Sequence, residues 1–126
     1  MHVINNIAGF FYGFMYVCSR NYEIEFMNNN LIELIGRNAI GELCYKALQG
    51  LDEACPWCPN AKVFDGKMVC QEVLSPRDNR WYYTVNTPYI FSDDEVLKMS
   101  MFIDVTEQKL SEVSSGEGDR CRRCMV

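Results

Sequence analysis

The order of short strands and helices is the feature that most constrains the fold of this chain. Two β-compatible runs, residues 13–18 and 22–27, stand near the start. In the second run, Tyr22, Ile24 and Phe26 alternate with two glutamates, which is the period of a half-buried strand. The short polar link between the runs predicts a hairpin. Three further strands are expected in the second half of the chain, at residues 68–74, 80–87 and 96–105.

Only short helices are expected between these two groups of strands. Asn28, Asn29 and Asn30 offer capping side chains before a helix over residues 31–36, and a second helix is expected over residues 38–48. Pro59 is suited to the first turn of a third short helix. A polar helix is predicted from Thr106 onward, capped by Asp104 or by Thr106 itself. Helices segregated between strand groups predict an α+β fold, with an antiparallel sheet and the helices on one face.

Size, charge and cysteine content narrow the class of protein. A chain of 126 residues has room for one core, so we expect one domain over residues 1–113 and a flexible Cys-containing tail over residues 114–126. The net charge of −5 carries no block of like charges, which disfavours nucleic acid as a partner. No apolar run approaches the ~20 residues of a membrane span, so no membrane contact is expected. An odd number of cysteines (seven) without a secretory signal predicts reduced thiols in the cytoplasm.

The order of strands and helices, together with four sequence segments at the corresponding positions, resembles the PAS family. The matching segments are GFMYVCSRNYEIEFMN, LIELIGRNAIGELCYKAL, RWYYTVNTPYIFSDDEV and FIDVTEQK, and the resemblance covers about Ile7 to Val113. The most specific match is Asp104-Val105-Thr106-Glu107, which is similar to the tetrapeptide that ends the last PAS strand. The CPWCP string is also similar to a subset of PAS-like sequences.

The resemblance implies a five-stranded antiparallel sheet and a non-catalytic sensory role. PAS domains are input modules of bacterial sensor histidine kinases, diguanylate cyclases and transcription regulators. They typically bind a ligand or cofactor between the sheet and the short helices, and they often form homodimers. Their exit helix joins an effector domain, which gives Asp104 and Thr106 a role in signal exit. Enzymatic activity is disfavoured, because the body of the chain has no histidine base, no paired-carboxylate motif and no phosphate-binding glycine loop.

The ligand and cofactor of such a pocket are not identified by the sequence. Haem is disfavoured because the only histidine is His2, far from the pocket-lining helices. A photoactive flavin is disfavoured because Cys44 lacks the neighbours of the Asn-Cys-Arg motif. A small organic ligand in an apolar pocket is expected instead. The candidate pocket residues are Asn86, Tyr83, Met99 and Met101.

Cys44, Cys55 and Cys58 form a candidate metal or redox site. Two thiolates at C-x-x-C spacing can bind one tetrahedral ion, Cys44 could be a third ligand, and a fourth could come from Cys70, Cys121 or Cys124. Zinc or an iron–sulfur cluster, a redox-active or structural thiol pair, and inert packing remain three open alternatives. Two alternatives to a ligand-binding sensor therefore remain. One is a metal or redox sensor that uses Cys44, Cys55 and Cys58, and the other is a dimerisation scaffold without ligand.

Overall fold

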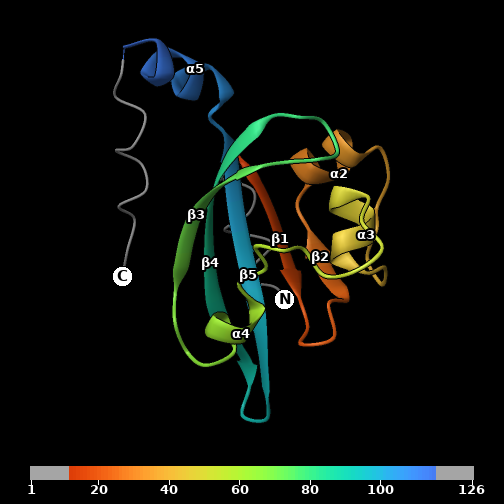
Figure 1. Cartoon of the computed structure of the whole chain (residues 1–126). Coiled ribbons are helices and arrows are strands. Elements are labelled where there is room, and N and C mark those ends of the chain that lie inside the picture. The colour runs from red at the N-terminus through yellow and green to blue at the C-terminus, as the bar shows by residue number, and fades with distance from the viewer. Residues whose placement is uncertain (1–11, 116–126) are drawn as a thin grey trace.

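The computed structural model describes residues 12–115, which form one five-stranded antiparallel sheet with short helices (Figure 1). The strand order is β2-β1-β5-β4-β3. The strands are β1 (Phe14–Cys18), β2 (Ile24–Met27), β3 (Val69–Leu74), β4 (Trp81–Ser92) and β5 (Glu95–Asp104). The helices are α2 (Asn29–Ile35), α3 (Cys44–Gln49), α4 (Asn60–Val63) and α5 (Thr106–Ser115). The predicted α+β fold and the predicted β1–β2 hairpin are confirmed.

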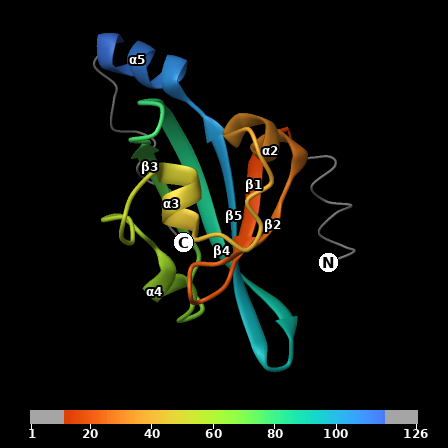
Figure 2. The ribbon, with the colours of Figure 1, turned by 90° about the vertical axis from the view of Figure 1, so that its right-hand side faces the viewer.

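The two faces of the sheet have different surroundings. Helices α2, α3 and α4 lie on the same side of the sheet, as the two views in Figures 1 and 2 show. We call this side the helix-covered face; its strand residues include Tyr16, Cys18, Tyr82, Thr84, Asn86, Lys98, Ser100 and Phe102. Their neighbours in sequence, such as Met15 and Met99, belong to the opposite face because side chains alternate along a strand. No helix within residues 12–115 is long and apolar enough to span a bilayer.

Asn28 holds α2 against β1. Its Oδ1 accepts hydrogen bonds from the N–H groups of Leu31 and Met15, both at 3.1 Å, and its Nδ2 donates to the carbonyl of Gly13 at 3.1 Å. The first bond caps the helix, as the asparagine run predicts. The other two tie the cap to the first strand, so this buried side chain fixes where the helix begins relative to the sheet.

The helix predicted over residues 38–48 is wrong at its beginning, because α3 covers only Cys44–Gln49. The preceding residues pair with β2 instead: the N–H of Ile24 donates to Glu42 O at 3.0 Å, and the N–H of Gly41 donates to Ile24 O at 2.8 Å. Gly41 adopts a φ of 94°, which a residue with a side chain rarely adopts and which ends any helix there. Long-range pairing therefore overrides the local helical pattern.

The strand predicted over residues 80–87 is too short. Strand β4 runs to Ser92 and passes through Pro88, which lies opposite Lys98 of β5. Proline is tolerated here because β3 pairs with β4 only as far as Asn86, so Pro88 faces no further strand within the described chain on its other side.

Candidate functional site

A cavity lies between the helix-covered face and the segments that cover it. Its volume is about 70 Å³, whereas one water molecule needs roughly 10–15 Å³ on the same measure. Tyr16, Lys98 and Phe102 line it from the strands, and Leu31, Leu48 and Trp57 line it from the covering segments. The space is therefore sufficient for several waters or for a small organic molecule, in the position where ligands usually bind between the layers of a domain.

The polar part of the cavity wall is a hydrogen-bonded chain on β4 and β5. The hydroxyl of Ser100 donates to Asn86 Oδ1 at 2.8 Å. Asn86 Nδ2 in turn donates to the carbonyl of Val69 at 3.1 Å and to Thr84 Oγ1 at 3.2 Å. Asn86 is thus held in one orientation, as a buried amide requires, and it lines the cavity.

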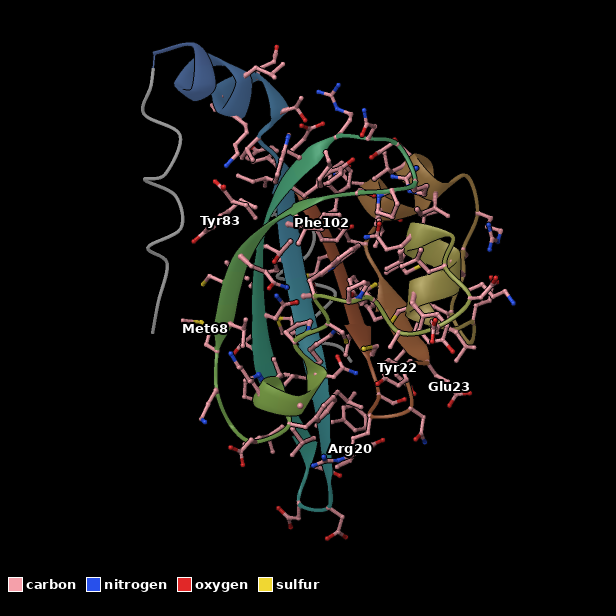
Figure 3. The ribbon with its side chains drawn as sticks, viewed as in Figure 1. Arg20, Tyr22, Glu23, Met68, Tyr83 and Phe102 are labelled. Carbon is pink, nitrogen blue, oxygen red and sulfur yellow. The ribbon has the colours of Figure 1, made fainter. Side chains whose placement is uncertain are left out.

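The other three pocket candidates do not line this cavity. Tyr83 precedes Thr84 on β4 and points away from the helices (Figure 3). Met99 and Met101 pack around the buried Met15 on the opposite face. The cause is the alternation of the strands, which gives these three residues the opposite parity to Asn86 and Ser100.

The three cysteines of the candidate metal or redox site all line the cavity. Cys44 begins α3, and Cys55 and Cys58 belong to a turn closed by the N–H of Cys58 donating to Cys55 O at 3.0 Å. All three are free thiols. Within residues 12–115, however, no three Cys, His, Asp or Glu side chains are arranged to hold a metal ion. Cys44 instead belongs to the same buried cluster as Cys18 at the end of β1.

The remaining cysteines lie elsewhere. Cys70 is on β3, opposite Val85 of β4, on the other face of the sheet from Asn86, and it is disulfide-bonded, so it is not available as a fourth ligand. Cys121 and Cys124, like His2, lie outside the described residues.

The thiols inside the cavity have different acidities. Its hydrogen bond with Cys18, followed by burial, raises the pKa of Cys44. The same hydrogen bond is the largest effect on Cys18 and lowers the pKa of that thiol. Burial, together with the neighbouring thiols, raises the pKa of Cys55 to about 11. Cys44 and Cys55 are therefore protonated at neutral pH, which makes them weak metal ligands and weak nucleophiles.

Lys98 is the residue of this site that sequence reasoning missed. It is 1% exposed and lines the cavity, with its Nζ 5.4 Å from the ring centroid of Tyr16. No carboxylate oxygen of the described residues lies within the 4.0 Å of an ion pair with it, although five other ion pairs are formed. The alternation in VLKMSMFID could have revealed it, because the pattern places Lys98 and Ser100 on one face with Phe102.

Two opposing effects act on the pKa of Lys98. Burial lowers it, and the negative charges of Tyr16, Cys18 and Cys44, when these groups are ionised, raise it by more. The upward direction thus depends on the ionisation of its neighbours. Burial also raises the pKa of Tyr16, so Tyr16 and Cys44 are neutral near pH 7 and offer the ammonium group no charge. The pKa of Cys18 is lowered, first by Cys44 and also by Lys98, so Cys18 is the neighbour whose ionisation Lys98 favours.

The two candidates for signal exit hold the first turn of α5. Asp104 Oδ1 accepts from the N–H of Thr106 at 2.9 Å, and Asp104 Oδ2 also accepts from Arg80. The hydroxyl oxygen of Thr106 accepts from the N–H of Trp81 at 2.8 Å. The last strand, the first residue of β4 and the start of α5 are therefore one hydrogen-bonded unit.

A second contact fixes α5 to the sheet. Lys109 Nζ pairs with Glu72 Oε1 of β3 at 2.6 Å and lies 4.8 Å from the ring centroid of Trp81. The helix lies at the end of the sheet, away from α2 and α3 (Figure 1). This pair joins β3 to α5.

Comparison with known proteins was made by sequence and by structure. No protein-family model and no curated protein matches the sequence. Solved structures do match. The PAS domain of BvgS from Bordetella pertussis is 14% identical, with a TM-score of 0.58 over 91% of this chain and 96% of that chain. The PAS domain of nitrogen regulation protein NR(II) from Vibrio parahaemolyticus is 9% identical, with a TM-score of 0.58 over 82% and 94% of the two chains.

A Light-Oxygen-Voltage domain studied with a flavin analogue is also similar, at 12% identity and a TM-score of 0.60 over 93% of this chain and 94% of that chain. These identities are low, so the likeness concerns the arrangement of strands and helices and not the chemistry of the cavity. Together with the strand order, it shows that this chain has a PAS-like fold.

Proposed function

We propose that this domain is a non-catalytic sensory module that binds a small molecule in the cavity and relays its binding through α5 to an effector domain. The observation that carries the proposal is the continuity of the cavity wall with the exit helix. Asn86 and Ser100 line the cavity on β4 and β5, and the same two strands end at the hydrogen bonds of Trp81, Asp104 and Thr106. A ligand that shifts these strands therefore acts directly on the first turn of α5.

The proposed partners follow from the fold. Several solved structures with this fold come from signalling proteins, and one is described as the sensor region of a sensor histidine kinase. A histidine kinase is accordingly the effector we propose, with two copies of the domain in a homodimer whose α5 helices lie side by side. Of the five cysteines among the described residues, Cys70 is disulfide-bonded and the other four are free thiols. The free thiols of the cavity support the cytoplasm as the location that we propose.

The relay is tested by measuring the distance between two α5 helices in the full-length dimer. A nitroxide is attached at Gln108, which is exposed, through an unnatural ketone amino acid, because the native cysteines exclude thiol labelling. We expect the distance distribution to change between the ligand-free protein and the protein saturated with its co-purifying ligand. In the Thr106→Val variant, which lacks the acceptor for the Trp81 N–H, the change should be reduced.

An unchanged distribution would contradict the relay. If native mass spectrometry finds no bound molecule, whatever the growth conditions, the domain is a dimerisation scaffold and not a ligand sensor.

A second candidate function is a thiol-based redox sensor, which the packing of the free thiols of Cys18 and Cys44 in one buried cluster favours. Oxidation would join the two sulfurs, and the two electrons and two protons would pass to an oxidant such as diamide. The test is differential alkylation with mass spectrometry before and after diamide treatment. A Cys18–Cys44 disulfide that forms and is reversed by dithiothreitol supports this function, and thiols that stay alkylatable rule it out.

A further inference from the structure

No carboxylate of the described residues pairs with the buried ammonium group of Lys98, whose neighbours are the Tyr16 phenol and the thiols of Cys18, Cys44 and Cys58. Its ammonium group is removed from water, and an unpaired charge in such a place is costly unless a partner neutralises it. Arg77 is the other cation of the cavity wall, and it is occupied: its Nε donates to Leu48 O at 3.1 Å and its Nη2 pairs with Asp78 at 2.9 Å. Lys98 is thus the cation of the cavity wall that has no carboxylate partner among the described residues.

The position of the ammonium group is fixed. Lys98 lies in the middle of the sheet, opposite Cys18 of β1 on one side and Pro88 of β4 on the other. Its Nζ stays near the ring of Tyr16, so the positive charge remains in the cavity and does not extend to the surface. A rigid, dehydrated cation of this kind attracts an anion more strongly than a lysine in water does.

We propose that the ligand of this cavity is a small organic monocarboxylate whose carboxylate pairs with Lys98. This inference rests on the proposed function and names the class of its ligand. One cation matches one negative charge, whereas a phosphate group would leave charge unpaired. The walls around Lys98 include Phe102, Leu31 and Leu48, which suit a hydrocarbon or aromatic body.

The test compares acids with their uncharged amides in the full chain. The probes are benzoate, phenylacetate and hexanoate, each with the amide of the same shape, and binding is measured by isothermal titration calorimetry after bound ligand has been removed by unfolding and refolding. We expect at least one acid to bind one site per chain, at least tenfold more tightly than its amide.

The Lys98→Met variant keeps a side chain of similar length without the charge, and it should weaken binding of that acid at least tenfold. The matched control is Lys46→Met, an exposed lysine on α3, which should bind the acid as the wild type does. Lys98→Gln provides a second uncharged variant if Lys98→Met does not fold, as judged by circular dichroism. The comparison of acid with amide on the wild type needs no variant at all.

Three results would overturn the inference: no binding of any acid to the wild type, equal binding of an acid and its amide, or undiminished acid binding by both Lys98 variants. Its failure differs from failure of the proposed function. A neutral molecule found in the cavity, with a shift of α5, would refute the carboxylate and leave the sensory role intact.

Discussion

The two faces of the sheet each bury a lysine beside an aromatic ring, and only one of these lysines has a carboxylate. On the opposite face, Lys109 of α5 lies against Trp81 and pairs with Glu72; the two charged side chains are 11% and 4% exposed. On the helix-covered face, Lys98 lies near Tyr16 and thiols, without a carboxylate from the described residues.

The difference separates a structural role from a binding role. A buried ion pair whose charges cancel within the protein holds α5 on the sheet and needs nothing from outside. A buried cation that has no carboxylate partner among the described residues lowers stability, and it is relieved when a molecule with the opposite charge enters. The predictions below test whether the two lysines differ in this way.

The largest effect is expected for Lys109→Ala, which removes the ammonium group that pairs with the buried Glu72 carboxylate. We expect the free energy of unfolding to fall by about 3 kcal/mol, as when one partner of a buried pair is removed. Urea denaturation followed by circular dichroism measures it. The exposed Lys46→Ala serves as the control and should change stability by less than about 0.5 kcal/mol. A Lys109→Ala loss as small as that of the control would show that the pair does not hold α5.

Lys98→Met should change the free energy of unfolding in the opposite direction from Lys109→Ala. In protein stripped of ligand, removal of an unpaired buried charge is expected to raise the free energy of unfolding by about 1–3 kcal/mol. The same urea denaturation measures it. A loss of stability of more than about 1 kcal/mol would instead indicate that Lys98 has a charged partner inside the protein, and the Cys18 thiolate is the nearest candidate.

The third prediction concerns the Cys55 thiol, whose burial on the helix-covered face should disfavour its ionisation and therefore slow its alkylation. With a pKa of about 11, its thiolate is scarce at pH 8, so iodoacetamide should modify it at least tenfold more slowly than in urea-unfolded protein. Peptide mapping by mass spectrometry measures the rate. Because the folded state keeps this proton to a higher pH than the unfolded state, its contribution to stability is present below about pH 9 and declines toward pH 11. A rate equal to that of the unfolded protein would contradict the shift.

The smallest effect is expected for Ser100→Ala, a neutral change in the cavity wall. It removes the hydroxyl that donates to Asn86 Oδ1 and should cost about 1 kcal/mol. Thermal and urea unfolding measure it, with the exposed Ser92→Ala on the β4–β5 hairpin as the matched control. Equal stability of the two variants would mean that water replaces the lost hydrogen bond.

The sequence predicts the architecture better than the site. The succession of strands and helices along the chain and the hydrophobic alternation predict an antiparallel sheet, since each is evident from residues close together in the sequence. The beginning of α3 and the extension of β4 through Pro88 depend on pairing with distant strands, which local patterns do not contain.

For the site, alternation shows which residues share a face but not which face the helices cover. Alternation puts Tyr83 and Asn86 on opposite faces of β4, so the two cannot both line one cavity, and the structure shows that Asn86 is the one on the helix-covered face. Met99 and Met101 lie on the other face with Met15. Lys98 was missed for a related reason, because a lysine in a strand is usually exposed and only the covering helices make it buried.

Pro88 has a further consequence for how the molecule behaves among its own copies. Beyond Asn86, the outer edge of β4 has no neighbouring strand among residues 12–115, and it carries the exposed Ile90 and Phe91. Such an edge can recruit a strand from another molecule and begin aggregation. A proline has no N–H to donate to an incoming strand, so Pro88 interrupts the ladder at this position. Pro88 therefore disfavours edge-to-edge association of the β4–β5 hairpin with another copy of the chain.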